Sequence, residues 1–209
     1  MSDKSSWINT YIPELISKWQ DSCHDVKWVH NVGDVDLGDC LFFLGSSQIA
    51  SADILSRNSH NLVVHESALP MGKGWSPLTW QILEGKNEIP ITLFEAVPGV
   101  DSGDIYLSDI MAFKGTELIE ELRGIQAEKT LSLCQQFVRD FPNILSYAES
   151  QKGSATYYPS RDKKDSELNP DESLRDQFNL LRVVDNERYP AFFEINQKRF
   201  VLKIFPDEA

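Results

Sequence analysis

The amino-acid sequence predicts an α/β protein built on a doubly wound, mostly parallel β-sheet. Short apolar stretches alternate with segments of helical periodicity over the first two-thirds of the chain, and this alternation is typical of βαβ units. Residues 40–44 are apolar on both faces of a strand, as in the centre of a parallel sheet. The length of 209 residues and the hydrophobic fraction of 41 % suit one domain with a small appendage.

Local signals place the helices and strands of this domain. Apolar residues recur at helical spacing over residues 11–19 and predict the first helix. Ser76 as a cap and Gly85 as a stop bracket a helix that begins at Pro77. Two more helices are expected over residues 51–55 and 116–141. The expected strands are residues 26–29, 40–44, 62–64 and 91–96.

The last third of the chain predicts a small C-terminal extension made of a helix and a hairpin. Residues 149–164 are polar and predict a crossing loop. Asn169, followed by proline and two acidic residues, predicts the start of a helix that runs to about residue 185. Two strands over residues 191–195 and 199–205 then form the hairpin. We therefore divide the chain into a catalytic domain, residues 1–146, and an extension, residues 147–209.

Composition narrows the classes of function. The chain has 20 Lys and Arg against 32 Asp and Glu, a net charge of −12, and an acidic surface repels the phosphate backbone of nucleic acid. We expect no nucleic-acid partner, and no membrane partner because apolar runs are short. The three cysteines are far apart, which is typical of a reduced cytoplasmic protein, and we expect no metal site.

Three predicted strands end in unusual polar residues. Residues 45–48 follow the first of these strands, His65 ends the second, and residues 100–104 follow the third. Ligands of open α/β sheets bind beyond the carboxyl ends of the strands, so these groups can converge. Taken singly, each has a structural alternative: His65 as a strand-end residue, Asp101 as a turn cap, and the glycines after His65 as turn residues.

The motif from Asn61 to Tyr106 resembles the folate-dependent formyltransferase family. The matching residues are His65-Glu66-Ser67-Ala68-Leu69-Pro70, Gly72-Lys73-Gly74, Pro77 and Val100-Asp101-Ser102-Gly103-Asp104-Ile105. In that family a histidine precedes a Ser-Leu-Leu-Pro-like run and a glycine loop, and an Asp-x-Gly follows some way on. The resemblance implies the Rossmann-like formyltransferase fold, and among family members the chain is most similar to the compact sugar N-formyltransferases of nonulosonic (pseudaminic-type) acid pathways.

The resemblance also implies a reaction and a donor. The donor is N10-formyltetrahydrofolate, whose formyl carbon is attacked by an amine. His65 would donate a hydrogen bond to the developing oxyanion, and Asp101 would orient His65 or remove the amine proton. The pterin would lie between two loops, and the residues expected to bind it are Gly45, Ser46, Ser47, Gln48, Ala96, Val97 and Val100.

One residue departs from the family motif. The family has an asparagine two residues before the histidine, and Val63 occupies that position. Asn61 lies on the same face of the strand but about 7 Å from Val63, too far to replace the missing amide. Glu66, Ser67 or a backbone group are the other candidates for the second donor.

The acceptor amine is expected to belong to an amino-deoxy sugar carried on a nucleotide. The residues expected to contact it are Ser67, Lys73, Gly74, Trp75, Tyr157, Arg161 and Arg182. Core packing for the aromatic residues and solvated surface charge for the arginines are the alternatives. Two other functions stay open: a formyltransferase acting on another small amine, such as a glycinamide-ribonucleotide-like acceptor, and a folate- or partner-binding module without catalysis. A homodimer formed through the apolar C-terminal hairpin also stays open.

Overall fold

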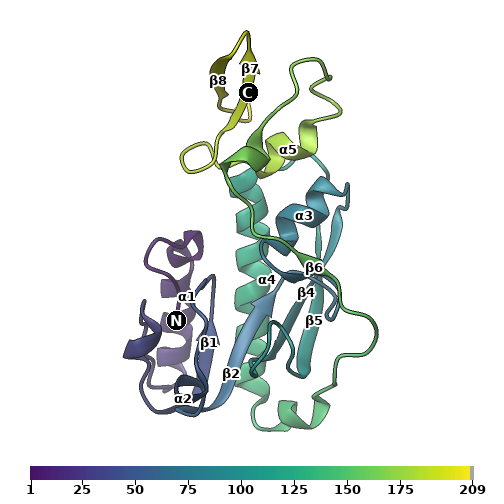
Figure 1. The fold of residues 1–209 in the computed structure, drawn as a ribbon. Coiled ribbons are helices and arrows are strands. Elements are labelled where there is room, and N and C mark those ends of the chain that lie inside the picture. Colours follow the sequence, from purple (N-terminus) through teal and green to yellow (C-terminus); the bar gives the residue numbers. More distant parts are fainter. Residues whose placement is uncertain (208–209) are drawn as a thin grey trace.

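The fold is a four-stranded sheet with helices on both of its faces. The computed structural model describes residues 1–207, and its strands lie in the order β1 (Gly38–Phe43), β2 (Asn58–His65), β4 (Glu88–Glu95) and β5 (Ile105–Ala112) (Figure 1). β1 and β2 are parallel, whereas the β2–β4 and β4–β5 pairings are antiparallel. The α/β class predicted from the sequence is confirmed, and the sheet is a mixed one.

Side chains alternate between two apolar clusters, one on each face of the sheet. α1 (Ile12–Asp21) and the long helix α4 (Ile119–Asp140) pack on the face that carries Phe42 and Leu62. The short helix α2 (Ala52–Leu55) packs on the opposite face, against Phe43. Successive strand residues point to opposite faces, so both clusters follow directly from the apolar stretches of β1 and β2. The predicted helices around residues 11–19, 51–55 and 116–141 are confirmed, with shifted ends.

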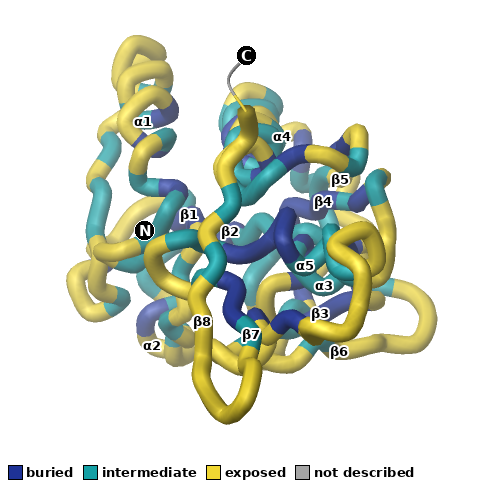
Figure 2. The backbone as a smooth tube through the Cα atoms, turned by 90° about the horizontal axis from the view of Figure 1, so that it is seen from above, coloured by how far each residue is buried: buried dark blue, intermediate teal, exposed yellow. Residues whose placement is uncertain are grey.

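Smaller elements connect and cap this layer. α3 (Pro77–Leu83) contacts α5 (Phe178–Val183), and the two-residue strands β3 (Lys73–Gly74) and β6 (Tyr157–Tyr158) pair in parallel. The 3₁₀ helices are η1 (Trp7–Thr10), η2 (Val32–Asp34), η3 (Asn143–Tyr147) and η4 (Lys163–Ser166). β7 (Ala191–Ile195) and β8 (Lys198–Leu202) form the predicted hairpin, which projects from the body and is largely exposed (Figure 2).

Three sequence predictions differ from the structure. Residues 26–29 form no regular strand. The helix predicted from Asn169 begins at Phe178 instead, because the Asn169 side chain accepts from Asp171 N and closes a turn there. β5 was not predicted; it is an edge strand with most side chains partly or fully exposed, so its apolar signal is weak. Across residues 1–207, no helix combines the length and the apolar character needed to cross a membrane.

Candidate active site

His65 ends β2 with its side chain buried. Its residue is 6 % exposed, and Val63, two residues earlier, shares its face of the strand. Val63 packs on the cluster formed by Leu41, Phe43 and Ile54. The position that carries asparagine in formyltransferases is therefore part of an apolar contact in this chain.

The glycine loop after His65 fixes the imidazole ring. His65 Nε2 lies 2.7 Å from the carbonyl oxygen of Gly72; because a carbonyl only accepts, Nε2 carries the hydrogen. The loop is in turn held by Thr156, the residue before β6: Gly72 N donates to Thr156 Oγ1 at 2.8 Å, and Lys73 N donates to Thr156 O at 2.9 Å. The ring orientation thus depends on the side chain and the carbonyl group of Thr156, which lies 84 positions after Gly72.

Gly74 must be glycine for two independent reasons. Its φ of +97° is in the region that L side chains rarely adopt, and an added Cβ would lie 2.5 Å from the carbonyl oxygen of Tyr158. The close approach permits the β3–β6 pairing, and that pairing frees Gly74 N to point toward Asp101.

Asp101 completes the pair with His65. Its Oδ2 accepts from Gly74 N at 2.8 Å and lies 3.8 Å from His65 Nε2. The side chains of His65 and Asp101 are 8 % and 17 % exposed, so charge on either one is only partly screened by water. An imidazole donor and a carboxylate that face each other in this way can stabilise a developing negative charge and accept a proton.

The loop that carries Asp101 reaches this point by an unexpected route. β4 runs antiparallel to β2 and ends at Glu95, opposite Leu62, three residues or about 10 Å before His65. The loop folds back from there, with Asp101 at φ +46°. Gln151 Nε2 holds the loop by donating to the carbonyl oxygens of Asp101 and Gly103 at 2.8 and 2.9 Å. The reasoning from carboxyl ends of parallel strands was therefore wrong for this loop, although Asp101 does meet His65.

Two further polar groups from the predicted substrate set lie on the same loops. Lys73 is 7 % exposed, and its Nζ donates to Ser102 Oγ at 3.3 Å. Ser67 is 2 % exposed, and its hydroxyl has no hydrogen-bond partner among residues 1–207. A buried hydroxyl without a partner is costly, so both groups are suited to binding a polar ligand.

Glu66 was not among the predicted site residues but adjoins them. Its carboxylate accepts from Gln126 Nε2 at 2.6 Å, and its carbonyl oxygen accepts from Gln81 Nε2 at 2.6 Å. Burial raises the pKa of the Glu66 carboxyl, and the coulombic interaction with the neighbouring His65 opposes this effect. The contact with α4 was not visible in the sequence, because Gln126 lies 60 positions away.

The two loops predicted to bind the pterin differ in how they are held. Residues 45–48 are tied to Asp3, which accepts from Ser46 Oγ, Ser47 N, Ser47 Oγ and Gln48 Nε2 at 3.3, 2.8, 2.6 and 2.8 Å. Ala96 N donates to Asn61 O at 2.6 Å, and Val97 and Val100 are 38 % and 56 % exposed. The Asn61 amide donates to Leu55 O at 2.9 Å and is not directed at His65.

The remaining predicted substrate residues do not all meet at His65. Trp75 and Tyr157 are 47 % and 64 % exposed beside the glycine loop, on and next to the β3–β6 pair. Arg161 lies over the ring of Trp80 and donates to Asp165 O at 2.6 Å. Arg182 is only 1 % exposed and is enclosed by the following partners: Glu117, Asn87 and Asn179. The structure gives Arg182 a core position rather than a surface one.

The described residues hold no cluster of three or more His, Cys, Asp or Glu side chains placed to bind a metal. The structure thus places a histidine and an aspartate side by side at a glycine loop of an α/β fold.

Comparisons with known proteins find similar sequences and folds among the formyltransferases. No family model matches the chain. Methionyl-tRNA formyltransferase from Caldicellulosiruptor saccharolyticus is 28 % identical over 141 residues, which are 68 % of this chain and 44 % of the relative. The corresponding protein from Clostridium acetobutylicum is 25 % identical over 183 residues, 87 % of this chain and 58 % of the relative. The chain thus spans about half the length of the curated relatives it matches.

Solved structures show the same fold. A methionyl-tRNA formyltransferase from Clostridium thermocellum has a TM-score of 0.81 at 21 % identity and covers 97 % of this chain and 90 % of its own. A 4-N formyltransferase from Francisella tularensis has a TM-score of 0.65 at 19 % identity, over 82 % of this chain and 72 % of its own. HypX from Aquifex aeolicus, solved with tetrahydrofolic acid, has a TM-score of 0.66 at 15 % identity. The match covers 79 % of this chain and 29 % of HypX. These likenesses confirm the resemblance seen in the sequence: the chain has the fold of the formyltransferase family and is related to it.

Proposed function

We propose that the chain transfers a formyl group from N10-formyltetrahydrofolate to the amine of an amino-deoxy sugar carried on a nucleotide. The observation that carries this proposal is the pair formed by His65 and Asp101, 3.8 Å apart beside the glycine loop. The relationship to formyltransferases supports the reaction class. The F. tularensis 4-N formyltransferase supports a sugar acceptor, and the tetrahydrofolic acid bound by HypX supports the donor.

The reaction forms a bond from the amine nitrogen to the formyl carbon and breaks the bond from that carbon to N10. Negative charge develops on the formyl oxygen, and the buried Nε2–H of His65 stabilises it when the formyl oxygen replaces Gly72 O as its acceptor. Preorganised donors of this kind are worth about 3–4 kcal/mol of barrier. Asp101 accepts a proton from the attacking amine, and N10 takes up a proton as it leaves. General-base action of this type contributes roughly 10²–10⁴-fold.

The two loops predicted to bind the pterin expose apolar side chains. Residues 45–48 are held by Asp3, and the neighbouring Ile49 is 86 % exposed. Val97 and Val100 on the opposite loop are also exposed. Exposed apolar side chains on two anchored loops can cover the faces of a pterin, while backbone groups of the loops bind its polar edge. We therefore assign residues 45–48, Ala96, Val97 and Val100 to the donor.

Lys73 and its neighbours are assigned to the acceptor. The Lys73 amine is buried and forms no ion pair with a carboxylate within residues 1–207, so its charge is free to bind an anionic group such as the diphosphate of a nucleotide sugar. Trp75 and Tyr157 provide exposed rings beside the glycine loop, where a base or sugar can stack. In this assignment residues 1–146 carry the donor site and residues 147–209 add one wall of the acceptor site.

A binding module without catalysis is the second candidate, and Val63 is the observation that favours it. The apolar packing of Val63 removes the amide that formyltransferases place beside the histidine. A module of this kind would bind the folate donor and release no product with any amine.

An assay of tetrahydrofolate release separates the two functions. The protein would be offered N10-formyltetrahydrofolate with nucleotide-linked 4-amino sugars and, in parallel, with glycinamide ribonucleotide. We expect turnover with a nucleotide-linked sugar, and its loss in His65→Asn and Asp101→Asn but not in the exposed controls His24→Asn and Asp25→Asn. Folate binding without release in every arm would favour the binding module.

A further inference from the structure

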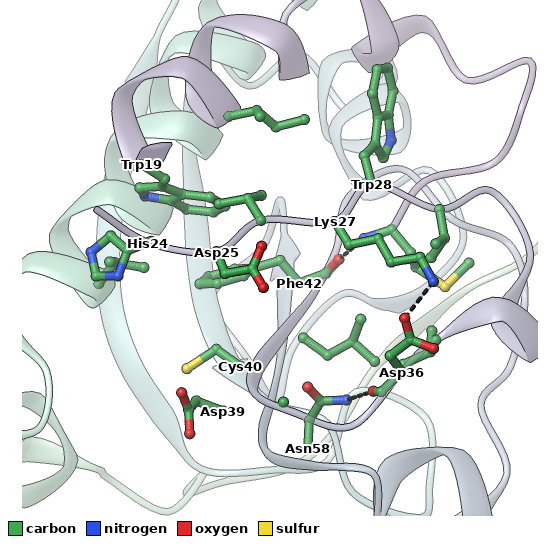
Figure 3. Close-up of a pocket in the computed structure, with 18 of the residues that line it drawn as sticks. Trp19, His24, Asp25, Lys27, Trp28, Asp36, Asp39, Cys40, Phe42 and Asn58 are labelled. Atoms are coloured by element: carbon green, nitrogen blue, oxygen red, sulfur yellow. Dashed lines mark hydrogen bonds and ion pairs between the residues drawn. The ribbon is translucent and has the colours of Figure 1, made fainter. Parts of the chain in front are cut away.

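Buried polar atoms without a partner are places where the structure can form a further hydrogen bond. Among residues 1–207, five buried side-chain atoms have none: Trp19 Nε1, Asn61 Oδ1, Ser67 Oγ, Gln151 Oε1 and Arg161 Nε. Trp19 lines a groove of about 790 Å³ beside β1, and the residues that line this groove do not include His65 (Figure 3). Ser67, in contrast, lies two positions after His65, at the start of the glycine loop.

The backbone of Ser67 is held on both sides, while its hydroxyl is not. Ser67 N donates to His65 O at 2.9 Å, and Ser67 O accepts from Thr92 Oγ1 at 2.7 Å. The residue is 2 % exposed, and its Oγ has no partner within residues 1–207. A buried hydroxyl in this state costs free energy, so we looked for the group that it can serve.

Ser67 packs directly against Gly72. A Cβ added to Gly72 would lie 2.9 Å from Ser67 Cβ and 3.4 Å from Ser67 Oγ. Both backbone polar groups of Gly72 are in use, because its N–H donates to Thr156 Oγ1 and its carbonyl oxygen accepts from His65 Nε2. Two side-chain donors, His65 and Ser67, therefore lie beside the same glycine, and only His65 bonds to it.

The proposed reaction takes the His65 donor away from Gly72. When the formyl oxygen becomes the acceptor of Nε2–H, the Gly72 carbonyl loses its hydrogen bond. Gly72 is buried, so water does not replace the lost donor. An unpaired buried carbonyl would oppose the release of His65, unless another donor takes its place.

We propose that Ser67 is a positioning residue, whose hydroxyl donates to Gly72 O when His65 turns to the formyl oxygen. The proposal rests on the formyl transfer proposed above. Rotation about the Cα–Cβ bond of Ser67 redirects the hydroxyl, while the Ser67 backbone stays held by His65 O and Thr92. One hydrogen bond at Gly72 is exchanged for another, and neither a covalent bond nor a proton is transferred in this step.

A direct contact with the acceptor is the other role for Ser67, and the geometry favours Gly72. The Cβ added to Gly72 would also lie 3.0 Å from Cε2 of Tyr158, so the chain itself fills the space on this side of Ser67. A ligand reaches the hydroxyl only by displacing the loop, whereas Gly72 already touches Ser67.

The first test compares Ser67→Ala and Ser67→Cys with Ser59→Ala, an exposed serine of β2. Cysteine has about the volume of serine but is a weak donor, so both Ser67 variants lose the donor and only alanine loses volume. We expect kcat for tetrahydrofolate release to fall roughly tenfold in both, with KM within about twofold of wild type. The melting temperature of Ser67→Ala should not fall, because the hydroxyl it removes has no partner within residues 1–207. Ser59→Ala should change neither quantity.

The second test needs no turnover, so it separates this proposal from the proposed function. In protein labelled with ¹⁵N-histidine, NMR follows the exchange of the His65 Nε2–H with water, which requires that the hydrogen leave Gly72 O. Loss of the Ser67 donor makes this opening more costly, and we expect exchange to slow roughly tenfold in Ser67→Ala and Ser67→Cys. Slowed exchange in a chain that shows no turnover would support the role of Ser67 at Gly72 while the formyl transfer fails.

Three results would overturn the proposal. Equal exchange of the His65 hydrogen in wild type and both Ser67 variants would show that Ser67 does not serve Gly72. A rise in KM with unchanged kcat would show that Ser67 contacts a substrate. A fall in kcat that is matched by a lower melting temperature in both variants would show a purely structural role.

Discussion

The end of β2 at His65 and the outer edge of β1 differ in how completely the chain surrounds them. At the end of β2, the β3–β6 pairing, the Gly72 carbonyl and Asp101 surround His65. At the outer edge of β1, a single residue, Met1, pairs with the strand beside a cavity of about 790 Å³. The comparison teaches that, among residues 1–207, several long-range contacts orient one imidazole, whereas the outer edge of β1 is paired at Met1.

Removing the imidazole at the end of β2 is expected to have the largest effect. His65→Asn deletes the donor held by Gly72, and we expect turnover to fall by roughly 10²–10³-fold with little change in KM. Steady-state kinetics with a nucleotide-linked amino sugar measures this. A larger rise in KM than fall in kcat would show that His65 binds substrate and does not stabilise the transition state.

Titration of the Met1 amine tests the outer edge of β1. Its pKa is lowered in the folded chain from 8.0 to about 6, so the unfolded chain binds more protons between these values and stability rises with pH across that window. The shift of about 2 pKa units corresponds to at most about 3 kcal/mol, fully present above pH 8 and lost as pH falls through 6. Urea unfolding at pH 6 and pH 8 measures the difference, and acetylation of the amine should abolish it.

Restoring the family asparagine tests the cost of the Val63 packing. Val63→Asn places an amide in the apolar cluster of α2, and we expect a loss of stability of about 1–3 kcal/mol. If the missing amide limits the reaction, kcat rises despite this loss; an unchanged kcat would show that the site works without it. Denaturant unfolding and turnover are measured on the same preparation, with Val63→Ala as the control for lost packing.

Replacing Asp3 is expected to give the smallest effect. Asp3 joins the segment at the outer edge of β1 to residues 45–48 and acts on the site only through them. Burial raises its pKa, but hydrogen bonds from Ser47, Gln48 and Ser46 outweigh burial, so the pKa lies below its usual range. Asp3→Asn weakens charge-assisted bonds to residues 45–48, and we expect Kd for a folate analogue to rise about 3-fold. Calorimetry checks this against exposed Asp21→Asn; equal affinity in both variants would separate Asp3 from the donor loop.

Much of the fold could be predicted because its apolar periodicity is local. The apolar run in β1, the helical spacing in α1 and α4 and the hairpin β7–β8 are each visible within a few residues. The direction of β4 could not be predicted, because an apolar strand reads the same in parallel and antiparallel pairings. Residues 26–29 have the composition of a strand, but among residues 1–207 only the backbone hydrogen bond from Ser2 N to Val29 O pairs them, so they form no strand.

The site was predictable in its residues more than in its geometry. The order of His65, the glycine loop and Asp101 carried the resemblance, and the structure brings all three together. Thr156 holds the glycine loop and Gln126 holds Glu66. The residues in these two contacts are 84 and 60 positions apart in the sequence, and no local pattern indicates such contacts. Arg182 has the charge of a phosphate ligand, and only the fold shows that it is enclosed with Glu117.

The most direct test of the central claim follows the formyl group itself. The protein would be incubated with N10-formyltetrahydrofolate labelled with ¹³C in the formyl carbon and with a nucleotide-linked 4-amino sugar, and the sugar would be analysed by mass spectrometry. Our account predicts labelled N-formyl sugar from the wild-type chain and from His24→Asn, and none above the uncatalysed background from His65→Asn. Labelled product in equal amounts from His65→Asn would contradict it.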